Sequence, residues 1–168
     1  QTWLFRSLQA QLDLVPLPDK DFRIGQQIIG SLDDDGYLRR SITSLTDALA
    51  FSQNIFADDD EVEEMLKIIQ SFDPPGVGAR SLQECLLIQL RKKDQNDLVI
   101  RKAMQVVENY LDEFTRKHYD KLEKSLSMTS QELRAVISEI LKLNPKPGDS
   151  NEVNTKQMHV LPDFHITN

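Results

Sequence analysis

The chain has little cysteine, little histidine and no long apolar run. Among its 168 residues there are one cysteine and three histidines. A single cysteine excludes an intrachain disulfide and is typical of a reducing compartment. No stretch approaches the roughly 18 consecutive apolar residues of a membrane span, and the first residues lack the basic-then-apolar pattern of a signal peptide. We therefore expect a cytoplasmic protein without a membrane segment, in which Cys85 is a small core residue.

The sequence also lacks the motifs of catalysis and of cofactor binding. The three histidines have no metal-ligand spacing, and the Gly76-x-Gly78 pair lacks the third glycine of a dinucleotide fingerprint. If Gly36 is counted as the sixth position of a calcium loop, Ile42 stands where a bidentate glutamate is required. No serine or cysteine has a nearby base that the sequence can identify. We therefore expect no enzyme, no cofactor and no metal site.

Positive charge is scarce in the first half of the chain. The net charge is −7, and residues 1–75 carry 6 basic and 14 acidic side chains, whereas residues 76–168 carry 14 and 13. Contact with nucleic acid requires clustered lysine and arginine, and an acidic half repels a duplex. The composition is 39% hydrophobic, which is enough for a folded core. We expect a monomer whose partner is a protein with basic patches.

What the chain does contain is a proline- and glycine-rich segment between two amphipathic stretches. Residues 73–80 read Asp-Pro-Pro-Gly-Val-Gly-Ala-Arg. Pro74 disfavours helical geometry at Asp73 and ends the preceding helix, and Pro75 stiffens the turn. Gly76 and Gly78 can adopt positive φ without a Cβ penalty. The segment therefore predicts a fixed backbone path.

A related segment occurs earlier at an offset of 40 residues. Residues 28–37 align with residues 68–77, and isoleucine, isoleucine, serine, aspartate and glycine are identical in both. The repeat predicts two related helical hairpins packed side by side. Two copies are too few for a solenoid. Alternatively, the match reflects how often helices end with aspartate and glycine.

Apolar residues recur at helical spacing through most of the chain, which predicts an all-α fold. The polar segment 94–97 is the candidate boundary between two packed helical subdomains. We expect duplicated hairpins in residues 1–94, a three-helix bundle in residues 95–148, and an extended tail in residues 149–168. The predicted helices are 2–14, 20–32, a short one from Thr43 or Ser44 through Ala50, 58–69, 81–93, 97–114, 116–125 and 130–143.

One pair of predicted helices allows a different function. The helices 116–125 and 130–143 have the length and apolar spacing of a DNA-reading helix-turn-helix, with Gln131 and Arg134 as the reading residues. The exposed positions of the second helix mix both charge signs and lack a basic flank. Packing between the helices is therefore favoured. A DNA-binding regulator remains the alternative function.

Three segments carry a family resemblance. Residues 32–38 read Leu-Asp-Asp-Asp-Gly-Tyr-Leu, residues 69–80 contain the proline- and glycine-rich segment, and residues 82–90 follow it. In residue identity and spacing they resemble the central core-binding domain of the bacterial sigma-54 transcription factor family. Residues 143–148 and 161–164 are similar to that family's continuation toward its DNA-binding part. The resemblance covers nearly the whole chain.

The resemblance implies a transcription initiation factor domain that binds bacterial core RNA polymerase. In full-length members of the family, promoter DNA and an ATP-hydrolysing activator are further partners. The resemblance also implies an excised domain that lacks the activator-responsive region, the promoter-reading helix-turn-helix and the basic C-terminal signature. Family members are described as having two helical subdomains in this region, which matches the break at 94–97.

The candidate polymerase-binding residues lie in the two repeated turns. Tyr37 is either an anchor of the hairpin core or an interface residue, because aromatic residues are favoured in both places. The prolines and glycines of the second turn can contact polymerase or only orient two helices. Exposed acids such as Asp58 to Asp60 would contribute at the rim. The candidates are Asp33, Gly36, Tyr37, Asp73, Pro74, Pro75, Gly76, Val77, Gly78 and Arg80.

Overall fold

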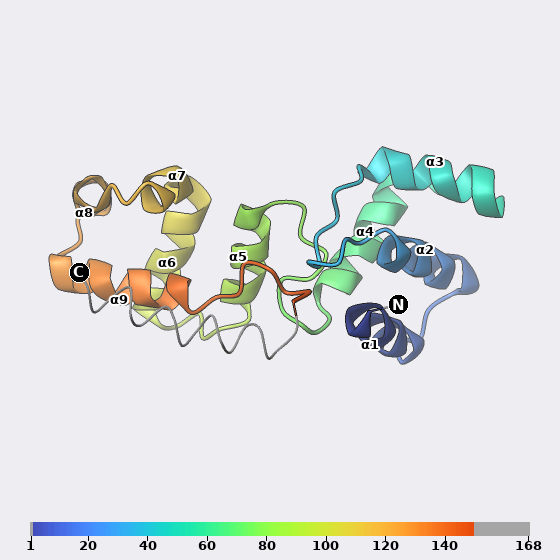
Figure 1. Cartoon of the computed structure of the whole chain (residues 1–168), viewed down its shortest axis with the longest axis horizontal. Coiled ribbons are helices and arrows are strands. Elements are labelled where there is room, and N and C mark those ends of the chain that lie inside the picture. Colours follow the sequence, from blue (N-terminus) through green and yellow to red (C-terminus); the bar gives the residue numbers. More distant parts are fainter. Residues whose placement is uncertain (1, 150–168) are drawn as a thin grey trace. The chain divides into compact units, whose positions relative to one another are not determined.

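The computed structural model describes residues 2–149, which form nine helices and no strand. The all-α prediction is confirmed. The predicted extended tail lies outside the described residues apart from Asp149. The helices are α1 Trp3–Asp13, α2 Asp19–Gly30, α3 Ile42–Gln53, α4 Asp59–Gln70, α5 Leu82–Arg91, α6 Leu98–Asn109, α7 Leu111–Thr115, α8 Tyr119–Leu126 and α9 Ser130–Leu141 (Figure 1).

The helices divide into two compact units. The first unit contains α1 to α4 and also the later segment Lys146–Asp149, and the second contains Leu82–Pro145. The boundary therefore lies before α5, whereas the polar segment 94–97 predicted it after α5. Helix α5 joins the second unit because its apolar face packs against α6. The residues of α5 in that core are Leu86, Leu87 and Leu90.

The first unit is built on the apolar faces of four amphipathic helices. Helix α2 packs against α1, α3 and α4, and α3 also packs against α4 (Figure 1). Leu4, Leu8 and Leu12 recur at intervals of one helical turn along α1, and all three are buried. Burial of each such side chain stabilises the fold by about 2 kcal/mol. Helix α4 begins with a capping box in which the Asp58 carboxylate accepts the Glu61 N–H at 2.8 Å.

The second unit is arranged around α6, which packs against α5, α7 and α9, while α8 packs against α7 and α9. The helix predicted over 97–114 is in fact two helices, because Tyr110 leaves helical geometry at φ −133° and ψ 26°. Tyr110, Leu111 and Phe114 all pack against the second core after this break. Tertiary packing therefore overrides a continuous local period.

Helix α9 begins as the sequence predicts. The Thr129 hydroxyl accepts the Glu132 N–H at 3.1 Å, and the Glu132 carboxylate accepts the Thr129 N–H at 3.0 Å. Lys102 of α6 lies 2.7 Å from the other carboxylate oxygen of Glu132. These contacts lower the pKa of Glu132 to about 2, with the hydrogen bond from Lys102 as the largest cause. The start of α9 is thus tied to the central helix of the second unit.

Candidate functional site

The two repeated turns lie side by side in the first unit. The Gly78 N–H donates to the Gly36 carbonyl at 2.8 Å, and the Leu38 N–H donates to the Ala79 carbonyl at 2.9 Å. Together with the packing of α2 against α4, these bonds confirm the predicted pairing of the two hairpins. We call residues 33–39 and 73–80 the paired turns.

Three glycines allow the paired turns to adopt their path. The φ angles of Gly36, Gly76 and Gly78 are 93°, 98° and 81°. Residues with a Cβ rarely adopt such φ angles. A Cβ on Gly78 would also lie 3.2 Å from Cγ of Gln70, whose side-chain amide donates to the Gly78 carbonyl at 3.1 Å. The glycines predicted to fix the backbone therefore do so.

The second turn is held at its first residue by a side chain that the sequence did not single out. The side-chain amide of Gln11 in α1 donates to the Asp73 carbonyl at 2.7 Å, and its oxygen accepts the Asp73 N–H at 2.9 Å. A residue before proline favours extended geometry, so its backbone groups are directed away from the helix that it follows. Gln11 satisfies both groups of Asp73 from a different helix.

The first turn is covered by a segment from much later in the chain. The Gly148 N–H donates to the Asp35 carbonyl at 2.8 Å. Pro147 and Gly148 are buried, and a Cβ placed on Gly148 would overlap the Asp34 carbonyl oxygen. Only glycine can approach the turn this closely. The segment Lys146–Asp149 therefore closes the first turn from outside.

An ion-pair cluster stiffens the first turn. Arg39 donates to Asp33 at 2.7 Å and forms two bonds to Asp35, each 2.9 Å long. Its guanidinium lies 4.9 Å from the centre of the Tyr37 ring, which is the geometry of a cation–π contact. The hydrogen bonds from Arg39 lower the pKa of Asp35, and the bonds to Asp35 and Asp33 raise that of Arg39.

The structure divides the ten candidate residues by exposure. Tyr37 is 7% exposed and Val77 is fully buried, so these two side chains support the turns from within. Arg80 is exposed and lies 3.0 Å from Glu63 of α4. The exposed candidates are Asp33, Asp73, Pro75 and Arg80, Pro74 is half-buried, and Gly36, Tyr37, Gly76, Val77 and Gly78 are buried.

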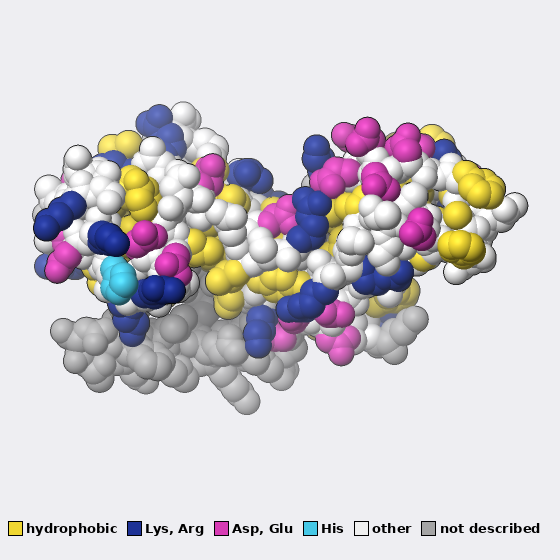
Figure 2. Space-filling model, turned by 90° about the horizontal axis from the view of Figure 1, so that it is seen from above, with side chains coloured by type: hydrophobic (Ala, Val, Ile, Leu, Met, Phe, Trp, Pro, Cys, Tyr) yellow, Lys and Arg dark blue, Asp and Glu magenta, His cyan; other side chains and the backbone are white. Residues whose placement is uncertain are grey.

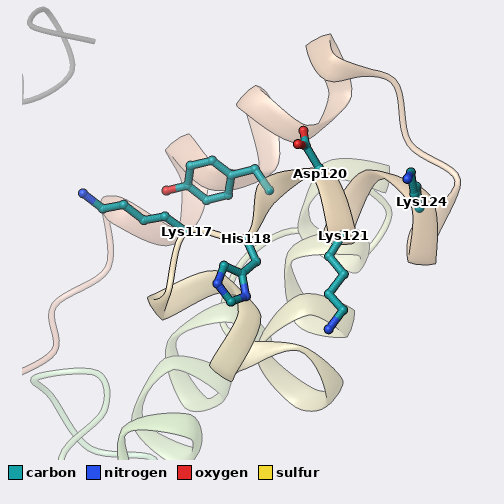
Figure 3. Close-up of a pocket in the computed structure, with 6 residues that line it drawn as sticks. Lys117, His118, Asp120, Lys121 and Lys124 are labelled. Carbon is teal, nitrogen blue, oxygen red and sulfur yellow. The ribbon is translucent and has the colours of Figure 1, made fainter.

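The candidates for DNA reading lie in the second unit. Gln131 and Arg134 are both exposed on α9. The preceding helix, α8, carries basic residues at a cleft of about 550 Å³ lined by Lys117, His118, Tyr119, Asp120, Lys121 and Lys124. In Figure 3, His118 and Lys121 extend to the same side, whereas Asp120 points away from them and Lys117 diverges from the others. The prediction that α8 and α9 only pack together rests on the charges of α9, and the basic residues of this cleft lie outside that helix.

The surface of the first unit is acidic. Asp47, Asp58, Asp59 and Asp60 are exposed on or next to α3 and α4. Figure 2 shows several acidic side chains on this unit, at the right of the view, next to exposed apolar ones. Within residues 2–149, no helix is long and apolar enough to cross a membrane. No group of three or more potential metal ligands from histidine, cysteine, aspartate or glutamate occurs in the same range.

Comparison with known proteins identifies the family. The family model described as "Sigma-54 factor, core binding domain" matches residues 1–168. The RNA polymerase sigma-54 factor of Pseudomonas aeruginosa is 36% identical over 163 residues, which are 97% of this chain and 32% of that protein. The proteins of the same name from Salmonella typhimurium and Azorhizobium caulinodans are 33% and 38% identical over 95% and 88% of this chain. These stretches make up 32% and 27% of the two relatives, so the chain spans about a third of their length. The chain therefore belongs to the sigma-54 core-binding domain family.

Proposed function

We propose that this chain binds bacterial core RNA polymerase through the exposed residues of the paired turns, as the core-binding part of a sigma-54 transcription initiation factor. One observation carries this proposal. The segments that bear the family resemblance are locked together by backbone hydrogen bonds from Gly78 to Gly36 and from Leu38 to Ala79. This arrangement holds Asp33, Asp73, Pro75 and Arg80 at the surface.

A rigid surface of this kind favours binding. The Gln11 clamp, the positive-φ glycines and the closing segment Lys146–Asp149 order the turns before any partner arrives. Association then loses less conformational entropy than it would with a loop that must be ordered on binding. The buried candidates act by holding this backbone path, and the exposed candidates make the contacts.

The charge of the first unit supports a basic partner surface. Opposite charges across an interface mainly raise the association rate and improve specificity. Raising the salt concentration should therefore slow the association with polymerase more than it speeds dissociation. In the longer proteins of this family, we expect promoter DNA and an ATP-hydrolysing activator to be bound by regions outside residues 1–168.

The proposal is tested by titrating fluorescently labelled chain with bacterial core polymerase. We expect saturable binding, with the Arg80→Ala variant weaker by about tenfold, as for a central charged contact. Glu63→Ala is the matched control, because it breaks the same ion pair but keeps the cation of Arg80. It should bind within about twofold of the unchanged chain. Absence of saturable binding at micromolar concentrations of correctly folded chain would refute the proposal.

A second candidate function is contact with DNA by α8 and α9. The observation that favours it is the basic cleft of α8, because Lys117, Lys121 and Lys124 could neutralise backbone phosphates. Duplex binding of this kind would weaken steeply as the salt concentration rises. Lys121→Ala would remove one phosphate contact and so reduce the slope of log binding constant against log salt concentration by about one. Duplex binding that survives high salt, or that is unchanged in Lys121→Ala, would contradict this function.

A further inference from the structure

A groove in the first unit lies next to the first of the paired turns. Its volume is about 420 Å³, and its lining includes α1, the end of α2 and the turn that follows. Leu4, Leu8 and Ile29 lie at its base and belong to the buried core of the first unit. The half-buried Phe5 and Leu32 also line the groove and supply its accessible apolar surface. The base of the groove is therefore held in place by the packing of α1 against α2.

Two carboxylates stand at the edge of this groove. Asp33 and Asp34 both line it, and both are exposed. Asp33 uses one carboxylate oxygen for Arg39, at 2.7 Å. The side chain of Asp34 has no hydrogen-bond or ion-pair partner within residues 2–149. An apolar surface ending at a carboxylate without a partner suits a side chain that has an aliphatic stem and a cationic head.

Gly30 leaves the wall of the groove open. It is the last residue of α2, it lines the groove, and a Cβ placed on it would meet no atom within 4 Å. Its φ is not positive, so other residues fit its backbone without strain. The position therefore accepts a large side chain without disturbing the core.

We propose that this groove receives a lysine or arginine side chain of core RNA polymerase, with the aliphatic stem on Phe5 and Leu32 and the cation at Asp34. This inference rests on the proposed function, because it names one contact within that interface. The supporting observations are the apolar lining, the carboxylate without a partner and the acidic surface of the same unit. A basic side chain of the partner complements all three.

The test compares substitutions that occupy the groove or remove the negative charge at its edge while leaving the core intact. Gly30→Phe places a ring at the groove wall, and Gly30→Ala is its matched control at the same backbone position. Asp34→Asn removes the charge at the edge, and Asp60→Asn is matched in net charge at an exposed site on α4. Each variant of the 168-residue chain is first compared with the unchanged chain by circular dichroism and thermal unfolding. Each is then titrated with core polymerase.

We expect Gly30→Phe and Asp34→Asn each to weaken binding by about tenfold, while Gly30→Ala and Asp60→Asn stay within about twofold. If Gly30→Phe does not fold, the comparison of Asp34→Asn with Asp60→Asn decides alone. Unchanged binding by folded groove variants, alongside clear binding by the unchanged chain, would overturn the groove inference and leave the proposed function standing. Failure of the unchanged chain to bind would overturn both. A loss confined to a Phe51→Ala, Phe56→Ala double variant would move the contact to those exposed side chains and overturn the groove.

Discussion

Each of the two units uses a glutamine to hold a residue that precedes a proline. In the first unit, the Gln11 amide donates to the Asp73 carbonyl at 2.7 Å and accepts the Asp73 N–H at 2.9 Å. In the second unit, Gln89 makes the same pair of bonds with Asn144, at 2.7 Å and 2.8 Å. The difference is burial, because Gln89 is only 8% exposed whereas Gln11 is half-buried. In both units, therefore, a glutamine side chain bonds the backbone of a pre-proline residue that follows a helix, and the two glutamines differ in burial.

The two repeated turns differ in a similar way. Gly36 and Gly76 occupy equivalent positions and have nearly the same φ, 93° and 98°. The closing segment Lys146–Asp149 bonds to the first turn through Gly148 and Asp35, whereas Gln11 holds the first residue of the second turn. The repeat alone therefore does not determine which turn is covered, and the two copies are expected to respond differently to substitution.

The largest effect is expected from breaking the cover of the first turn. A Cβ on Gly148 would overlap the Asp34 carbonyl and approach the Gly36 nitrogen to 2.6 Å, so Gly148→Ala should destabilise the first unit by about 3 kcal/mol. Fluorescence of Trp3, the single tryptophan, reports this unit during urea unfolding. Gly30→Ala is the control and should change stability by less than about 1 kcal/mol. Equal unfolding midpoints for the two variants would contradict the proposed role of Gly148.

The next effect compares the two glutamines directly. Gln89→Ala removes two hydrogen bonds from a buried position and should lower the free energy of unfolding by about 2–3 kcal/mol. Gln11→Ala should lower it by about 1 kcal/mol, because water can replace its bonds. Gln131→Ala, on the exposed face of α9, should stay within about 0.5 kcal/mol of the unchanged chain. Amide hydrogen exchange should show faster exchange in α5 and α9 for the Gln89 variant and in α1 and α4 for the Gln11 variant. A larger loss of unfolding free energy in Gln11→Ala than in Gln89→Ala would show that burial does not set the size of the effect.

A third, smaller effect depends on pH and belongs to the second unit alone. The pKa of Glu132 is about 2, below the ordinary value of 4.5, so its contribution to stability is complete above pH 4.5. The contribution is lost as the pH falls toward 2. Urea unfolding should therefore show a gap between Glu132→Gln and the unchanged chain that is constant near neutrality and closes below pH 4.5. A gap independent of pH would refute the ion pair with Lys102.

The smallest effect on stability is expected at the ion-pair cluster of the first turn. Arg39→Met removes bonds of an exposed side chain, so the free energy of unfolding should fall only slightly. The pKa of Asp35 should nevertheless rise, because the hydrogen bonds from Arg39 are the largest cause of its lowered value. Carboxyl titration by nuclear magnetic resonance measures this change. An unchanged titration of Asp35 would show that Arg39 does not hold it in solution.

Local patterns predicted the helices and the paired turns, because both depend on residues close in sequence. The periodic apolar residues of α1, α2 and α4 and the glycines of the repeat were visible in the sequence. The helix break at Tyr110 was not visible, because it results from packing against the second core. The polarity of residues 94–97 predicts a linker there, but α5 belongs with the helices after it, because its apolar face packs against α6.

The missed site residues act over long separations in sequence. Gln11 meets Asp73 across 62 positions, and Gln89 meets Asn144 across 55. A glutamine in an amphipathic helix gives no local sign that it will serve a distant backbone. The pre-proline aspartate and asparagine did give a sign, because extended residues after a helix need partners for their N–H and C=O groups.

The central claim is that the paired turns of the first unit, and not α8 and α9, face polymerase. A photo-crosslinking amino acid placed at Asp73 and, separately, at Arg134 tests this directly, because both side chains are exposed. With core polymerase present, we predict a covalent product from position 73 and none from position 134. Crosslinking from position 134 alone, by chains that remain folded and bind polymerase, would contradict the account.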